Sequence, residues 1–285
     1  MSQPPANYSL QGLRCLAIIP AFNESGSVGR VVRAIKRELP QFDIVVIDDG
    51  SVDTTVHEVP GFARVISLPF NLGIGGAMQT GYRYAALHGY DLAVQVDADG
   101  QHPPEEMHKL LHALLHGGER GPCDLVIGSR FVATVKYRQT FARMVGIHFI
   151  RHLIKLLVGL WITDPTSGYR AANHRVIRAF AHWYPDDYPE PEVVLLLHRG
   201  GFRVREVQVE MHQRTTGVTS IPTLRGVFYV VKVATCLLLD MFRRPWPEAK
   251  VGPRRESPQQ PPSPQNSPQP AAHPEATGAA GVPQP

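Results

Sequence analysis

The chain has 285 residues and 43% hydrophobic content, enough for one large α/β domain or for one domain with appendages. Its formal net charge of +4 is small, and Lys and Arg are too sparse to indicate a nucleic-acid-binding protein. The three cysteines (Cys15, Cys123 and Cys236) have neither metal nor redox spacing, and their odd number argues against a disulfide framework. We therefore expect a reduced, cytoplasmic chain.

The termini and the apolar segments carry no targeting or membrane-spanning signal. Residues 1–12 lack the apolar stretch of a signal peptide. No apolar run reaches the roughly 18 residues of a membrane span, because charged residues interrupt the two longest candidates, 148–162 and 227–242.

Composition also suggests three parts of the chain. We expect an N-terminal extension over residues 1–13, a folded domain over 14–242 and a disordered tail over 249–285. The tail holds ten of the 26 prolines and has no apolar periodicity, so it cannot form a packed core.

Short apolar runs alternate with helical patterns over the first 130 residues. Strands are predicted at 14–19, 43–47, 65–68, 92–96 and 124–128, and helices at 27–39, from the glycine-rich loop 71–77 to about residue 87, and at 104–116. This alternation predicts an α/β fold with a doubly wound, mostly parallel sheet and helices on both of its faces.

Three of these strands end in polar clusters, at Asn23-Glu24, Asp48-Asp49 and Asp97-Ala98-Asp99. Ligands of open α/β sheets bind beyond the carboxyl ends of the strands. Two carboxylates that meet at one point repel unless a cation lies between them, and a hard divalent ion with oxygen ligands fits. Gln101 offers a further, neutral oxygen. Taken alone, the Asp97–Asp99 triplet is more typical of a polar turn or a helix N-cap than of a cation site.

The glycine-rich segment matches no phosphate-binding signature. Gly73, Gly75 and Gly76 fit neither the dinucleotide fingerprint nor a P-loop. Close packing of backbone against a strand and direct contact with a ligand both remain open.

The second half combines positive charge with apolar bulk. Between residues 130 and 163 there are six Lys or Arg and no acid (Arg130, Lys136, Arg138, Arg143, Arg151 and Lys155), interleaved with large apolar side chains. A basic amphipathic helix over 138–161 favours an anionic membrane surface over simple packing on the domain. A helix opening at Glu190 and Glu192, a strand at 202–209 and a long apolar helix at 224–242 are expected to follow.

Six motifs occur in this order: PAFNE, VIDDGS, NLGIGGAMQTGY, DADGQHPPE, VIGSRF and DPTSGYR. Together they resemble family 2 glycosyltransferases of the GT-A fold, in the subgroup of dolichyl- or polyprenyl-phosphate sugar synthases. The resemblance covers residues 15–242 and is strongest up to Arg170. It divides the domain into a nucleotide-sugar half, 14–130, and an acceptor- and membrane-facing half, 131–242.

The resemblance implies a metal-dependent, inverting transfer of a sugar from a nucleotide-sugar donor to a polyprenyl (dolichyl or undecaprenyl) phosphate. The enzyme would act peripherally on the cytoplasmic face of the membrane, and a small membrane-protein partner stays open. The donor residues implied are Pro20, Phe22, Glu24, Ile47, Asp49, Asp97, Ala98, Asp99, Gln101, Arg130 and Arg214. Asp97, Asp99 and Gln101 would hold Mg²⁺ or Mn²⁺. The resemblance makes Arg130 and Arg214 two arginines that contact phosphate. Mannose-transferring members of the subgroup carry a lysine six residues after the second of them, where this chain has Ser220.

The acceptor decides which further residues the chemistry needs. Departure of a nucleoside diphosphate builds negative charge, which a divalent ion and Arg130 would stabilise. An anionic lipid phosphate needs no strong base, whereas a hydroxyl acceptor needs a carboxylate, for which Asp99, Asp164 and Glu192 are candidates. A saccharide acceptor in cell-surface polysaccharide assembly and a catalytically silent nucleotide-binding scaffold are the alternative functions.

Overall fold

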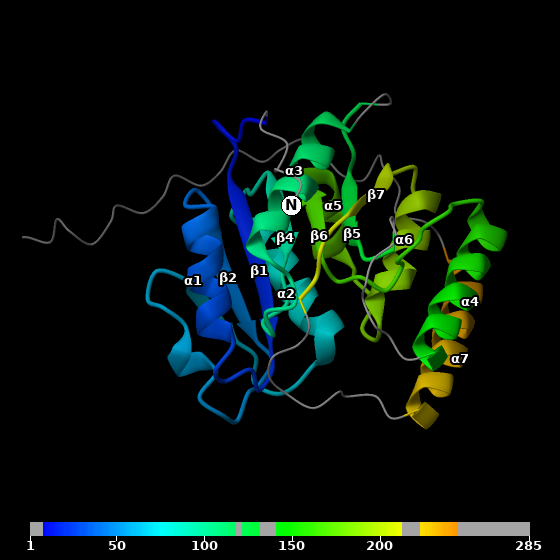
Figure 1. Ribbon diagram of the computed structural model, residues 1–285, viewed down its shortest axis with the longest axis horizontal. Coiled ribbons are helices and arrows are strands. Elements are labelled where there is room, and N and C mark those ends of the chain that lie inside the picture. Colours follow the sequence, from blue (N-terminus) through cyan, green and yellow to red (C-terminus); the bar gives the residue numbers. More distant parts are fainter. Residues whose placement is uncertain (1–7, 118–120, 132–140, 213–222, 244–285) are drawn as a thin grey trace, which may run out of the picture. The chain divides into compact units, whose positions relative to one another are not determined.

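The computed structural model describes residues 8–117, 121–131, 141–212 and 223–243 (Figure 1). Side chains at 141–143 and 223–227 are not among those described. The predictions for Arg214, for Lys136 and Arg138, for the side chain of Arg143 and for the tail at 249–285 therefore lie outside the described residues.

Seven strands in this part of the chain form one sheet, in the order β3-β2-β1-β4-β6-β5-β7. Their bounds are β1 Cys15–Ala21, β2 Asp43–Asp48, β3 Arg64–Ser67, β4 Leu92–Gln95, β5 Leu125–Ser129, β6 Arg170–Asn173 and β7 Val204–Gln208. All neighbours are parallel except β6, which runs antiparallel to both β4 and β5. The predicted mostly parallel, doubly wound α/β sheet is confirmed.

Central strands are buried because helices cover both sheet faces (Figure 1). On one face lie α1 (Val28–Glu38) and α3 (Met107–His116), which follows the short helix η2 (Pro104–Glu106). On the other lie α2 (Gly73–Leu87), α5 (His174–His182) and α6 (Pro189–Arg199). The apolar runs of β1, β4 and β5 are buried along their whole length, which is why sequence patterning alone located these strands.

Strand β6 and helix α5 were not predicted from the sequence. Arg170 opens β6 opposite Gln95, the last residue of β4. The side chain of Asn173 then accepts hydrogen bonds from the backbone N–H groups of Arg175 and Val176 and caps α5. Because β6 is antiparallel, its amino end and the preceding turn at 164–169 lie at the carboxyl end of β4.

Helices α4 (Phe141–Val158) and α7 (Thr223–Asp240) pack against each other and against α6. They share a small core that is separate from the two cores of the sheet, made by Ile150, Ile154, Leu195, Leu196, Val233 and Leu237. None of the helices in the described residues combines the length and the apolar character that a membrane span requires.

The predicted glycine-rich loop is wrong in part, because α2 already begins at Gly73. Gly75 lies in this helix, where its N–H donates to the carbonyl of Asp186. A Cβ at Gly75 would come within 2.2 Å of the carbonyl oxygens of Pro185 and Asp186. Close backbone packing therefore explains Gly75.

Candidate functional site

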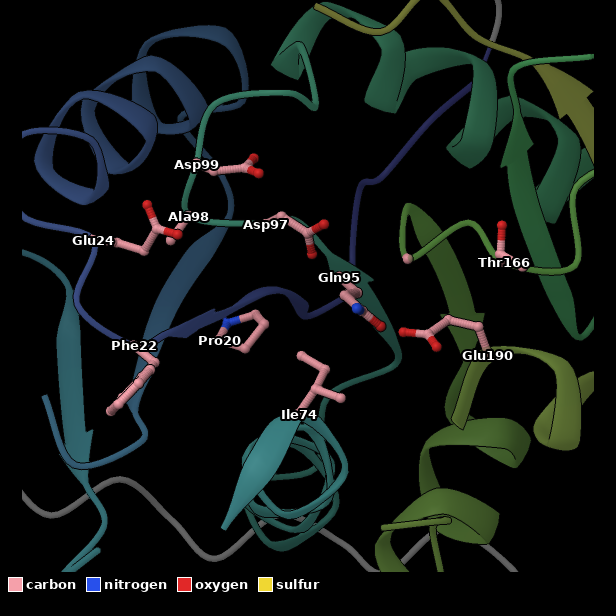
Figure 2. Close-up of a pocket in the computed structure, with 11 residues that line it drawn as sticks. Pro20, Phe22, Glu24, Ile74, Gln95, Asp97, Ala98, Asp99, Thr166 and Glu190 are labelled. Carbon is pink, nitrogen blue, oxygen red and sulfur yellow. The ribbon is translucent and has the colours of Figure 1, made fainter. Parts of the chain in front are cut away.

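A pocket of about 270 Å³ lies at the carboxyl ends of β1 and β4. It is lined by Pro20, Phe22, Glu24, Ile74, Gln95, Asp97, Ala98, Asp99, Thr166, Gly168 and Glu190, most of which are labelled in Figure 2. Six of the residues predicted from the sequence thus meet there: Pro20, Phe22, Glu24, Asp97, Ala98 and Asp99. The turn before β6 and the start of α6 supply the opposite wall.

Asp97 is positioned by His102, three residues after the Asp97–Asp99 triplet. His102 Nδ1 accepts the backbone N–H of Asp97 at 3.1 Å, so the neutral ring carries its proton on Nε2, 3.6 Å from Asp97 Oδ2. The buried imidazole stacks on Tyr169 with centroids 4.4 Å apart. The Asp97 side chain itself remains 36% exposed and accessible to a ligand.

Asp99 is more buried and is tied to Gln101. Its Oδ1 accepts the Gln101 N–H at 3.0 Å, and its Oδ2 accepts the Gln101 side-chain amide. Gln101 does not line the pocket, so its role as a metal ligand stays a prediction. Among the described residues no group of three or more His, Cys, Asp or Glu could hold a metal ion. The pair Asp97 and Asp99 therefore fits a divalent ion only if a substrate supplies further oxygen ligands, as phosphate oxygens do for Mg²⁺.

Asp49 and Ile47 lie outside the pocket. Asp49 Oδ1 accepts the Leu72 N–H at 2.7 Å at the start of α2. The dipole of α2 also stabilises a negative charge at this end of the helix. Burial raises the pKa of Asp49, although hydrogen bonds from the Leu72 and Gly73 backbone lower it. Ile47 is fully buried in the core beneath α2. Direct contact of either residue with a nucleotide stays a prediction.

Arg130 follows β5 and forms a buried ion pair with Asp164. Arg130 Nη2 also donates to Thr166 Oγ1 at 3.2 Å, which connects the pair to the pocket wall. Glu206 of β7 holds the loop that carries Asp164. Its carboxylate accepts the backbone N–H of Thr163 at 2.6 Å and that of Asp164 at 2.7 Å. Burial raises the pKa of Glu206, and these bonds lower it. Sequence reasoning missed Glu206, since nothing in a strand pattern marks such a contact.

Two of the carboxylates predicted as general bases lie away from the pocket. Asp164 is fully buried and its oxygens accept from Arg130, so it acts as that arginine's partner. Glu192 is buried in α6 near Cys236 and Asp240 of α7. The pocket instead contains Glu190, one helical half-turn earlier, which the sequence analysis had noted only as a helix-opening residue.

Comparison with known proteins gives the family. The sequence profile described as Glycosyl transferase family 2 matches residues 16–180. Polyprenol monophosphomannose synthase of Mycolicibacterium smegmatis is 32% identical over 219 residues, which cover 73% of this chain and 81% of that protein. Undecaprenyl-phosphate mannosyltransferase of Micrococcus luteus is 35% identical over 175 residues, 59% of this chain and 69% of that one.

Solved structures agree on the fold. Glucosyl-3-phosphoglycerate synthase from Mycobacterium tuberculosis, solved in complex with Mn²⁺, uridine diphosphate and glucosyl-3-phosphoglycerate, superposes with a TM-score of 0.61 at 19% identity, covering 81% of each chain. At that identity the likeness concerns the fold alone. The mixed sheet, the strand-end pocket and the matching profile together show that this chain belongs to glycosyltransferase family 2 and is a glycosyltransferase of the GT-A fold.

Proposed function

We propose that the enzyme transfers a sugar from a nucleotide-sugar donor to a polyprenyl phosphate, with inversion at the anomeric carbon. The pocket formed by Phe22, Asp97 and Asp99 is the observation that carries this proposal. Phe22 is 45% exposed on the pocket wall and offers an aromatic face to a nucleotide base, while the two aspartates suit a diphosphate held through a cation. Two relatives whose names state polyprenol or undecaprenyl phosphate support the acceptor.

Asp97 and Asp99 would hold Mg²⁺ or Mn²⁺ together with oxygens of the donor diphosphate. When bound, such an ion supplies positive charge that stabilises a departing nucleoside diphosphate. The chain adds the positive charge of Arg130, which Asp164 and Thr166 hold beside the pocket. His102 accepts the backbone N–H of Asp97 and so holds the segment that carries its carboxylate.

The acceptor phosphate would attack without a protein base. A phosphate oxygen forms a bond to the anomeric carbon while the bond from that carbon to the donor diphosphate breaks, and the leaving diphosphate takes the electron pair. Because the nucleophile is already anionic, no carboxylate has to accept a proton. Asp164 and Glu192 lie away from the pocket, and Asp99, the third carboxylate considered as a base, would be engaged with the cation.

The membrane is the expected source of such an acceptor. Helices α4 and α7 lie side by side (Figure 1), and each exposes large apolar side chains among its polar ones: Met144, Val145, Phe149 and Leu156 on α4, and Phe228, Val231, Leu238 and Leu239 on α7. We call these eight residues the apolar face. Exposed patches of this kind mark interaction surfaces, and Lys155 beside them suits anionic headgroups. We propose peripheral binding of this face to the cytoplasmic surface of a membrane.

The test is a transfer assay with defined lipid. The purified protein is incubated with a panel of radiolabelled nucleotide sugars, Mn²⁺ and vesicles that contain undecaprenyl phosphate, and the lipid is extracted into organic solvent. We expect one donor to label the lipid, and mild acid to release the free sugar from its phosphate linkage. Asp97→Asn is the matched inactive control. If the label enters only water-soluble saccharide, the acceptor is a sugar hydroxyl and the proposed lipid acceptor is wrong.

A further inference from the structure

Gln95 lines the pocket, and its side-chain oxygen has no hydrogen-bond partner in the described part of the fold. Among the described residues, Gln95 Oε1, Arg170 Nη1 and the Tyr82 hydroxyl are buried and have no hydrogen-bond partner. Gln95 is 2% exposed, and Arg170 and Tyr82 are fully buried. Buried polar groups are nearly always hydrogen-bonded, since an unpaired one destabilises the fold. An unpaired amide oxygen on a residue that lines the pocket therefore indicates a ligand that pairs with it.

Sheet register brings two of these residues together. Gln95 and Arg170 are directly opposite each other on the antiparallel strands β4 and β6, so their side chains share one face of the sheet. Their neighbours two positions away on that face, Ala93 and Ala172, belong to the apolar core under α2. This face of the sheet thus changes from apolar to polar at the carboxyl end of β4. The positive charge of Arg170 acts on the hydroxyl of Tyr82 in α2 and lowers its pKa, against the larger effect of burial, which raises it.

Glu190 completes this cluster from α6. Arg170 Nη2 donates to the Glu190 carbonyl at 2.9 Å, and Arg170 Nε donates to the Ser167 carbonyl at 2.7 Å. Burial raises the pKa of Glu190, the Arg170 charge opposes this, and Asp97 adds to it. In Figure 2 the side chains of Gln95 and Glu190 point toward each other across the space beside Asp97.

We propose that Gln95 and Glu190 bind hydroxyl groups of the donor sugar and so determine which sugar the enzyme accepts. This inference rests on the proposed function, because it takes the diphosphate to lie at Asp97 and Asp99. Gln95 is two residues before Asp97, a spacing of about 6–7 Å along a strand, so the group attached to the diphosphate reaches the amide. A carboxylate accepts from a hydroxyl and an amide both donates and accepts, which is the chemistry that a sugar ring requires.

Binding measurements test the proposal without the acceptor. Calorimetry in Mn²⁺ gives dissociation constants for uridine diphosphate and UDP-glucose, and for guanosine diphosphate and GDP-mannose, on the wild type, Gln95→Met and Glu190→Gln. For the better of the two nucleotide sugars, we expect the ratio of its dissociation constant to that of its nucleoside diphosphate to rise about 10- to 100-fold in each variant, since a buried partner is lost. The nucleoside diphosphate alone should bind equally well. Asp186→Asn, an exposed carboxylate just before α6, is the matched control and should leave the ratio unchanged.

Deoxy analogues of that same nucleotide sugar identify the hydroxyl. The wild type should discriminate against one deoxy analogue, and the responsible variant should lose this discrimination. An unchanged ratio in both variants overturns the proposal. The proposal is also overturned if Glu190→Gln leaves the ratio of dissociation constants unchanged but lowers turnover and removes the acidic limb of the pH profile of turnover. Glu190 would then be a general base.

The failure of the proposed function looks different. In that case the wild type binds the nucleotide sugar and shows the expected ratios, yet it labels no lipid phosphate. Circular dichroism melting of each variant shows whether it is folded, and Glu190→Gln, at a partly exposed position, tests the proposal even if Gln95→Met unfolds.

Discussion

Arg130 and Asp164 are joined by two parallel hydrogen bonds, from Nε to Oδ2 at 2.7 Å and from Nη2 to Oδ1 at 2.8 Å. The Arg130 side chain is 7% exposed and that of Asp164 is fully buried. The Arg130 N–H donates to the same carboxylate at 3.2 Å. The orientation of this arginine at the end of β5 is therefore fixed by a residue from the turn that precedes β6.

Asp164→Asn should destabilise the fold, because it leaves the Arg130 charge buried without its partner. Removal of one member of a buried pair costs about 3–5 kcal/mol. We expect a loss of this size in the free energy of unfolding, measured by urea denaturation. The control is Asp187→Asn, which breaks an exposed pair with Lys232 and should cost less than about 1 kcal/mol. Equal losses in both variants would contradict a special role for the Arg130 pair.

Asp97→Asn and Asp99→Asn should each remove most of the transfer activity, with a loss of at least about 100-fold, because charge at the leaving group is no longer stabilised. EDTA should reproduce the loss in the wild type, and Mn²⁺ or Mg²⁺ should restore it. Melting curves of both variants should stay close to that of the wild type, since both side chains line the pocket and asparagine at position 99 keeps an oxygen that can accept from Gln101. Full activity in EDTA would refute the metal site.

Glu192→Gln should make stability less dependent on pH. Burial, followed by the charge of Asp240, raises the pKa of Glu192 to about 7 from its usual 4.5. The unfolded chain therefore loses this proton first, and the folded state of the wild type is destabilised as pH rises from 4.5 to 7. Glutamine does not ionise and removes this penalty.

The comparison of interest is unfolding in urea at pH 5 and at pH 8. The advantage of Glu192→Gln over the wild type should be larger at pH 8 by on the order of 2 kcal/mol. Transfer activity of the variant is measured alongside. A pH-independent difference in stability would show that Glu192 is ionised in the folded enzyme.

Binding to membranes should depend on the apolar face rather than on basic residues alone. Arg151 is unsuitable for a charge-reversal test, because its guanidinium donates to the Thr163 carbonyl next to Asp164. Leu156 is 82% exposed, so Leu156→Glu should remove apolar contact without disturbing the core. We expect less of this variant to float with anionic vesicles.

Leu87→Glu is the matched control, since Leu87 is 74% exposed at the end of α2 and lies outside the apolar face. It should float as the wild type does. High salt should reduce flotation of the wild type through screening of Lys155 and other basic residues. Equal flotation of the Leu156 and Leu87 variants would rule out the apolar face as the membrane contact.

Helices and strands whose apolar residues recur with a clear period could be predicted from the sequence alone. Val28, Val32 and Ile35 recur at helical spacing, and all three are buried on α1. Strand β6 was missed because it has four residues, two of them alanine, and opens on a buried arginine, which no alternation pattern indicates.

The site was predictable where chemistry follows a strand and unpredictable where distant segments meet. Asp97 and Asp99 come directly after β4, so their place in the pocket followed from α/β topology. Glu190 is 93 residues further along the chain than Asp97, and a carboxylate at a helix start is common without function. Only the three-dimensional packing of α6 identifies it as part of the pocket wall.

Strand order has a consequence for how the protein is made. Strands β1 to β4 pair with one another, so they can form a sheet as they leave the ribosome. Strand β5 has as its only neighbours in the described sheet β6 and β7, which are synthesised later. Until residue 173 has emerged, the apolar residues Leu125, Val126 and Ile127 have no partner strand, and their second edge stays unpaired until residue 208; such exposed edges promote aggregation. A ribosome that stalls between residues 130 and 170 would therefore leave a nascent chain that needs a chaperone.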